Sequence, residues 1–92
     1  MPNDDHVAMV GRGAAAWNAW RAEHGETPNL SRAGLRGLDL SGFDLSQANL
    51  RQADLRGTNL SQANLSRAHL DGAEGLTQDQ LDRAHISQVY NL

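Results

Sequence analysis

The chain has 92 residues, no cysteine and a formal net charge of −3 at pH 7. This length suits a single domain, and the absence of cysteine excludes a disulfide framework and a thiolate metal site. No apolar run is long enough to span a membrane, and the N-terminus carries the acidic pair Asp4 and Asp5 where a signal peptide would carry positive charge. We therefore expect a cytoplasmic protein.

Residues 1–27 are predicted to form an N-terminal capping helix that covers about residues 5–24. Asn3, Asp4 or Asp5 is expected to cap its start, and Gly25 its end. Apolar residues three or four positions apart form one stripe along it: Val7, Val10, Ala14, Trp17 and Trp20. We expect the two tryptophans to cover the open end of the next segment beside Phe43. A ligand cleft between them is the alternative.

Residues 28–74 carry the most regular feature of the chain, a leucine at every fifth position from Leu30 to Leu70. An α-helix turns about 100° per residue, so leucines five apart would spiral around it, and a straight strand would alternate them between faces. The chain must therefore bend once in every five residues. The predicted core consists of Leu35, Leu40, Leu45, Leu50, Leu55, Leu60, Leu65 and Leu70, together with Phe43.

The other positions of the unit keep the same period. Two residues before each leucine stands a mostly small apolar residue, such as Ala48 or Ala53, and one residue before it stands a mostly polar residue, such as Asn49 or Asp54. Alanine and leucine two apart share one face of a short extended segment, so the residue between them faces water. The two residues after each leucine then form a corner, where glycine recurs because tight turns can require a positive φ.

The units Ala-Asn-Leu-Arg-Gln (48–52) and Ala-Asp-Leu-Arg-Gly (53–57) resemble the A(D/N)LXX unit of the pentapeptide-repeat family. The resemblance covers residues 28–74 and implies an all-β solenoid. Its form would be a right-handed quadrilateral β-helix of about two coils, with about 20 residues in each coil. Residues depart from the pattern at the small position (Leu38, Phe43 and Thr58) and at the Asp/Asn position (Gly34 and His69).

In such a coil, side chains about 20 residues apart stack at a spacing of ~4.8 Å. Leu50 then lies between Leu30 and Leu70. The oversized Leu38 and Phe43 lie in the first coil, where they can meet whatever covers its end. Because exposed coil ends are unpaired β edges, and solenoids need polar caps, we expect a cap at each end.

Residues 75–92 are predicted to form a C-terminal capping helix and a tail. Thr77 is the expected N-cap, Gln80 completes a capping box, and Leu76 and Leu81 fit a hydrophobic staple. The helix should run to about Ala84, and residues 75–84 also resemble the usual ending of these proteins. The tail beyond it either finishes the cap or docks on a second chain, and its apolar residues are Ile86, Val89, Tyr90 and Leu92.

The sequence predicts no catalytic, cofactor-binding or metal site. Corner serines such as Ser41 and Ser61 lack a positioned histidine base, and outward carboxylates such as Asp39 and Asp54 would lie on flat, wet faces. The four histidines share no ligand spacing. We expect a non-enzymatic structural or protein-interaction module without a cofactor, whose partner is another, unidentified protein.

Some pentapeptide-repeat proteins mimic DNA and inhibit DNA gyrase or another topoisomerase, and the resemblance implies this as the alternative function. A mimic should show a long acidic face, yet residues 28–74 contain five arginines and five acidic residues. About two coils would also rise only ~10 Å. The alternative therefore requires a homodimer formed through an end or the C-terminal tail. An acidic chain with few aromatic residues does not predict direct nucleic-acid binding.

Overall fold

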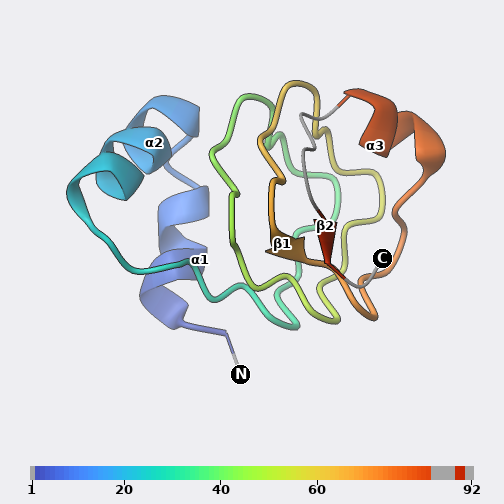
Figure 1. Cartoon of the computed structure of the whole chain (residues 1–92), viewed down its shortest axis with the longest axis horizontal. Coiled ribbons are helices and arrows are strands. Elements are labelled where there is room, and N and C mark those ends of the chain that lie inside the picture. The colour runs from blue at the N-terminus through green and yellow to red at the C-terminus, as the bar shows by residue number, and fades with distance from the viewer. Residues whose placement is uncertain (1, 84–88, 91–92) are drawn as a thin grey trace.

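The computed structural model describes residues 2–83 and 89–90, and its repeat region winds into stacked coils (Figure 1). Two helices lie at one end of the coils and a third lies at the other. Regular strand is limited to two strands of two residues each in the described part of the chain. The elements, in chain order, are α1 (Asp4–Val10), α2 (Ala14–Glu23), β1 (Ala68–His69), α3 (Gln78–Arg83) and β2 (Val89–Tyr90).

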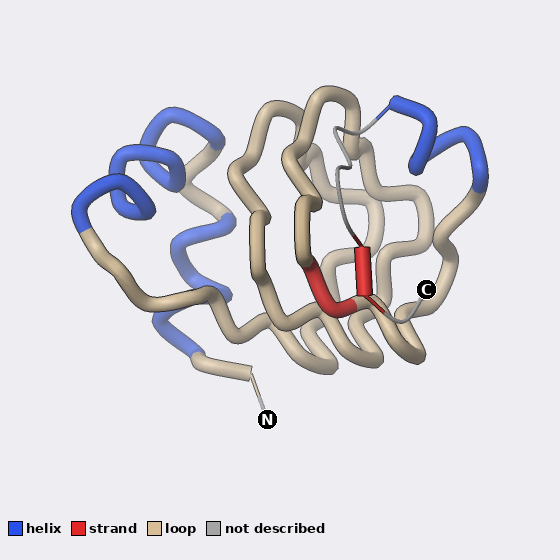
Figure 2. The backbone as a smooth tube through the Cα atoms, viewed as in Figure 1, coloured by secondary structure: helices blue, strands red, loops and turns tan. Residues whose placement is uncertain are grey.

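Backbone hydrogen bonds join the coils in the expected register of 20 residues. Ala33 O accepts from Asp54 N at 3.0 Å, and Asp54 O accepts from Leu35 N at 3.0 Å. Parallel bridges repeat this pairing around the coil: Asn29 with Asn49, Gly34 with Asp54, Asp39 with Asn59, Asp44 with Asn64, Asn49 with His69, and Asp54 with Glu74. Each extended piece is short because a turn interrupts it, so most of the coil is drawn as loop in Figure 2.

The corner that follows each leucine is a tight turn. Leu50 O accepts from Ala53 N at 3.1 Å, and Gln52, the third residue of that turn, has a φ of 61°. A positive φ at this position is typical of a type II turn. The same corner is made by glycine at Gly57, with a φ of 72°, so the five-residue period places one left-handed residue in each unit.

The preference for Asp or Asn before each leucine has a local cause. The side-chain Oδ1 of Asn49 accepts from Arg51 N at 3.2 Å, and Oδ1 of Asp39 accepts from Ser41 N at 3.0 Å. Such Asx turns tie the outward side chain to the next corner. The Asp and Asn side chains therefore stabilise the turn that follows each leucine.

Alanine and leucine side chains fill the interior, as predicted. Leu50 and Ala53 are fully buried, and Phe43 is buried in the first coil (residues 29–48). Thr58 departs from the small apolar pattern but is buried, because its hydroxyl donates to Leu35 O at 3.0 Å. The predicted core leucines are all buried: Leu35, Leu40, Leu45, Leu50, Leu55, Leu60, Leu65 and Leu70.

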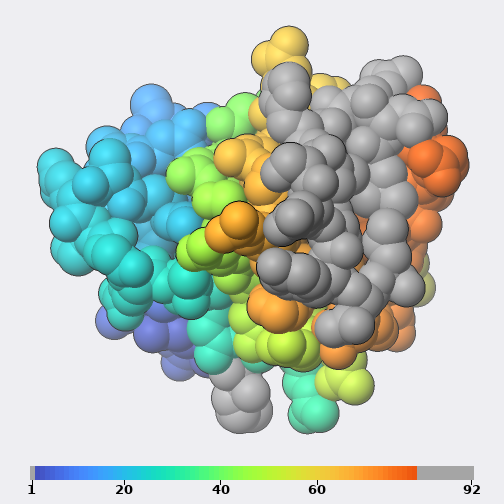
Figure 3. All heavy atoms as spheres, in the orientation of Figure 1, coloured from blue at the N-terminus to red at the C-terminus, as the bar shows by residue number. Residues whose placement is uncertain are grey.

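The N-terminal segment differs from the single helix expected over residues 5–24. It forms two helices, α1 and α2, because Gly13 between them has a φ of 91°, outside the helical region. Asn3 is the N-cap of α1, and its Oδ1 accepts from Asp5 N and His6 N. Helix α2 ends at Glu23, and its C-cap is His24, one residue before the expected Gly25. Figure 3 shows this helical segment packed against the coils.

Leu38 is a second departure, because its side chain is 40% exposed although it occupies an inward position of the first coil. The helices cover Phe43 at the next inward position but leave Leu38 open. The expectation that both oversized residues meet the cap is therefore correct for Phe43 and wrong for Leu38.

Helix α3 begins with the predicted capping box. Thr77 N donates to Gln80 Oε1 at 2.7 Å, and Gln80 N donates to Thr77 Oγ1 at 3.2 Å. Leu76 is half-buried against the core, whereas the side chain of Leu81 lies outside the described residues. Strand β2 of the tail pairs with β1, Ala68 with Val89 and His69 with Tyr90. This pairing continues the ladder; Ile86 and Leu92 lie outside the described residues.

No helix in residues 2–83 is long and apolar enough to cross a membrane.

Candidate functional site

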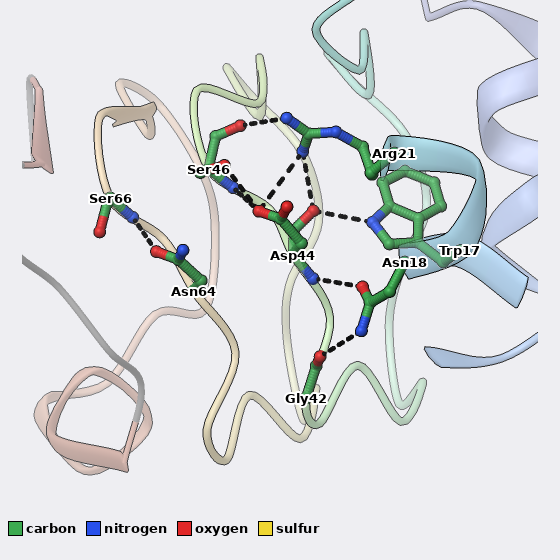
Figure 4. Close-up of polar contacts among 8 residues, drawn as sticks. All are labelled: Trp17, Asn18, Arg21, Gly42, Asp44, Ser46, Asn64 and Ser66. Atoms are coloured by element: carbon green, nitrogen blue, oxygen red, sulfur yellow. Dashed lines mark hydrogen bonds and ion pairs between the residues drawn. The ribbon is translucent and has the colours of Figure 1, made fainter. Parts of the chain in front are cut away.

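Helix α2 docks on the rim of the first coil through side chains that bond the free backbone groups there (Figure 4). Asp44 O accepts from Trp17 Nε1 at 2.8 Å and from Arg21 Nη1 at 2.8 Å. Asn18 Oδ1 accepts from Asp44 N at 2.8 Å, and Asn18 Nδ2 donates to Gly42 O at 2.9 Å. These side chains take the place that an earlier coil would occupy, so this part of the rim is closed.

The tryptophans form a packed cap in place of a ligand cleft. Trp17 is fully buried, with its ring centre 5.5 Å from that of Phe43 and 5.2 Å from that of Trp20. His6 is also buried, and its Nδ1 accepts from Asn29 N at 2.9 Å. Trp20 is half-buried and contacts the His6 ring. An open cleft between Trp17 and Trp20 is therefore excluded.

Gln80 bonds part of the opposite rim in a similar way. Besides its role in the capping box, Gln80 Nε2 donates to Leu55 O at 3.2 Å and to Thr58 O at 2.9 Å. The predicted cap residue Gln80 thus also bonds the coil, whereas the two hydrogen bonds that Thr77 makes with Gln80 stay within the capping box. The sequence showed the capping box but did not show that the same amide reaches the coil.

The outward carboxylates are held by neighbours and stay ionised. Arg56 donates to Asp54 from Nε at 2.9 Å and from Nη2 at 2.8 Å. These hydrogen bonds lower the pKa of Asp54 to about 2 from 3.8. Hydrogen bonds from Ser41 also lower the pKa of Asp39. A general base at neutral pH needs a raised pKa, so neither carboxylate suits that role.

The corner hydroxyls are likewise bonded locally. Ser41 Oγ donates to Asp39 Oδ1 at 2.6 Å, and Ser46 Oγ donates to Asp44 Oδ1 at 2.6 Å. Each hydroxyl is therefore engaged by a carboxylate two residues earlier. Within the described residues, no three His, Cys, Asp or Glu side chains come together as a metal site would need.

Two hollows adjoin Arg51 on the side of the coil that carries Asn49. The first has a volume of about 520 Å³ and the second about 450 Å³, and both are lined by Asn49 and Arg51. The first is completed by Ser31, Arg32, Gln52, Asp71 and Gly72, and the second by Thr27, Gln47, Arg67 and His69. We call this surface the Arg51 side.

Arg51 is fixed between two neighbours on this surface. Its Nε lies 3.2 Å from Asp71 Oδ1, and its Nη2 donates to His69 Nδ1 at 3.0 Å. Three arginines, Arg32, Arg51 and Arg67, line the hollows against the single carboxylate of Asp71. The Arg51 side can therefore attract anionic groups, although the chain as a whole is acidic.

Sequence reasoning did not find this surface. The 20-residue register offered the missing signal, because it brings Arg32 next to Gln52 and Arg51 next to Asp71. Arg67, at the corner just before Ala68 and His69, lines the second hollow on the same side.

The comparisons with known proteins agree with this repeat geometry. The family model of pentapeptide repeats matches residues 29–67 and 48–74, with eight copies. No curated protein matches the chain, and no solved structure matches it. The two family matches together span half of the chain, across the segment that forms the coils. The chain therefore belongs to the pentapeptide-repeat family.

Proposed function

We propose that the chain is a right-handed quadrilateral β-helix of about two coils, closed by α-helices, that works as a non-enzymatic protein-interaction module in the cytoplasm. Its partner is another protein, which contacts the Arg51 side. One observation carries the proposal: two adjacent hollows share Asn49 and Arg51 and contain three arginines against one carboxylate.

The partner surface should be acidic. Guanidinium groups bind carboxylates through charge-assisted hydrogen bonds, and opposite charge speeds the encounter of two proteins. Arg51 is already oriented by Asp71 and His69, so binding would order fewer side chains than on a mobile surface. A rigid coil with a preformed cationic surface fits recognition of a folded partner.

A catalytic role has less support. Ser41 and Ser46 donate their hydroxyl hydrogens to carboxylates, and Asp54 has a pKa of about 2. These groups are engaged in turns and ion pairs along the surface of the coil. The proposal accordingly assigns no reaction and no cofactor.

Inhibition of DNA gyrase by DNA mimicry is also less favoured. A mimic replaces the phosphate charge of duplex DNA, whereas the Arg51 side carries an excess of arginine. A supercoiling assay decides this directly. We expect relaxed plasmid to be supercoiled by gyrase at the same rate with and without the chain.

Site-specific photo-crosslinking in cells tests the proposed surface. A benzophenone amino acid at Gln47, which lines the second hollow, should crosslink one abundant partner. The same amino acid at Gln62 is the control, because Gln62 is also an exposed corner residue and has nearly the same φ, 61° against 62°. Equal crosslinking from both positions would contradict the proposal.

The partner identified by crosslinking is then purified on its own, and its affinity for the natural chain and for variants is measured. Arg51→Glu should weaken its binding at least about tenfold, because the change replaces attraction by repulsion at the shared wall of both hollows. Arg12→Glu, on the exposed turn between α1 and α2, is the matched charge control and should bind like the natural chain. Equal affinities of the two variants would refute the assignment of the Arg51 side.

A further inference from the structure

The rim of the first coil is closed over only part of its length. Asn29 N and O bond His6 and Asn3, and Asp44 N and O bond α2 side chains. Gly34 and Asp39 occupy the equivalent positions between them. In the described part of the chain, the backbone N–H and C=O groups of Gly34 and Asp39 that face away from the second coil have no hydrogen-bond partner.

We call residues 34–41 the open edge. In the second coil, the equivalent residues are Asp54 and Asn59, and their backbone N–H and C=O groups bond the first coil. The open edge presents the same kinds of backbone donor and acceptor without a coil to bond them. Leu38 lies within it and is 40% exposed, the one large apolar side chain exposed among residues 2–80. Unpaired β edges beside exposed apolar side chains are templates for strand addition.

The shape of this end favours a narrow occupant. Helices α1 and α2 stand beyond the first coil at the same end (Figures 1 and 2). Bringing the open edges of two copies face to face would bring both helical layers into the same space. A single segment of polypeptide that bends with the coil needs only the ~4.8 Å of one further rung, so it can lie beside the helices.

Charge indicates what this segment carries. Arg36 is exposed at the corner of the open edge and forms no ion pair with the described residues. The carboxylate of Asp39 already accepts two hydrogen bonds from Ser41. Asp39 stays charged, so the open edge has no net charge, and the charge of Arg36 also helps to lower the pKa of Asp54. Arg36 is nevertheless the charged group of this edge that is engaged by neither an ion pair nor a turn, and a carboxylate is its natural complement.

We propose that the open edge binds an acidic segment of another protein, which adds one further rung to the coil. The segment bends with the coil at the corner formed by Arg36 and Gly37, so that it exchanges backbone hydrogen bonds with Gly34 on one face and with Asp39 on the next. It covers Leu38 with an apolar side chain and places a carboxylate near Arg36. This site is separate from the Arg51 side and does not depend on it.

A random octapeptide library displayed on phage, panned against the 92-residue chain, tests the proposal. Enriched peptides should include Asp or Glu, an apolar residue, and a turn-forming residue such as Gly or Asn near the middle, because the peptide must bend with the coil. Gly34→Pro removes the N–H donor at an edge position where proline is tolerated, and should weaken the enriched peptides about fivefold to tenfold, the equivalent of one backbone hydrogen bond.

Matched variants distinguish the loss of a specific contact at the open edge from a general loss of the fold. Gly34→Ala keeps the N–H, and a Cβ there meets no atom within 4 Å, so its affinity should equal that of the natural chain. Leu38→Ser changes an exposed side chain without touching the ladder, and should also weaken binding. Arg36→Gln should weaken binding of the acidic peptides but not of their Asn or Gln analogues.

Three results would overturn the proposal. The first is a panning that yields no peptide sensitive to Gly34→Pro or Leu38→Ser. The second is equal loss of binding in Gly34→Ala and Gly34→Pro. The third is a chain that sediments as a dimer dissociated by Leu38→Ser, since a second copy would then occupy the edge. The effect of Arg51→Glu on binding of the purified crosslinking partner bears only on the Arg51 side, so failure of one proposal can be distinguished from failure of the other.

Discussion

Leu50 offers a quantitative test of the assignment that the leucine side chains point into the interior of the coils. Its side chain is fully buried, and backbone ladders join its unit to the coils on both sides. Truncating a buried leucine to alanine costs about 2–5 kcal/mol, more where neighbours cannot collapse into the cavity. The ladders fix the spacing of the coils, so we expect Leu50→Ala to lie in the upper part of that range.

Leu50→Asp should be more damaging still. An unpaired buried charge costs several kcal/mol beyond the lost packing, which approaches the whole stability of a typical domain, about 5–15 kcal/mol. We expect this variant to be unfolded at neutral pH. Urea denaturation followed by tryptophan fluorescence is a suitable assay, because Trp17 is fully buried in the folded chain.

Two controls make the test specific. Asn49→Asp changes the adjacent outward side chain and keeps the Oδ1 acceptor for Arg51 N, so its effect should stay within about 0.5 kcal/mol. Leu38→Ala makes the same truncation at a side chain that is 40% exposed, and should cost less than half as much as Leu50→Ala. Similar losses in Leu50→Ala and either control would refute the inward and outward assignment.

Three further changes test the caps and the outward ion pair. Trp17→Ala should destabilise the chain by about 3–5 kcal/mol and lower hydrogen-exchange protection first in the first coil; uniform loss of protection along the coils would count against the cap. Gln80→Ala should cost about 0.5–2 kcal/mol, as cap losses do, and an unchanged urea midpoint would show that its bonds to Leu55 and Thr58 do not matter. Arg56→Gln should raise the pKa of Asp54 from about 2 toward 3.8, measured by NMR titration of the carboxyl carbon. Since the folded-state pKa is depressed, the Asp54 interaction stabilises the fold above about pH 4 and is lost as the pH falls toward 2; an unchanged pKa in the variant would contradict Arg56 as the cause.

The repeat could be predicted from the sequence because several kinds of residue recur with the same period. The leucines, the alanines and the Asp or Asn residues keep a five-residue spacing, and each class answers a separate physical demand: burial, close packing and turn formation. The capping box at Thr77 and Gln80 was readable for the same reason, since both of its hydrogen bonds are local.

Long-range features were harder to predict. The break in the N-terminal helix had a local signal, the Gly-Arg-Gly run at residues 11–13, but the apolar stripe runs through it without a change of spacing. Docking of Arg21 on Asp44 and of His6 on Asn29 depends on how the helices lie against the coil. The exposure of Leu38 follows from the same placement, which spacing alone does not determine.

The register of the coils is tested most directly by NMR couplings measured across hydrogen bonds. We expect a correlation between the amide of Asp54 and the carbonyl carbon of Ala33, and another between the amide of Asn64 and the carbonyl carbon of Phe43. Correlations between residues four apart throughout residues 30–70, as in a helix, would contradict it. An antiparallel pattern, as in a sheet of hairpins, would contradict it equally.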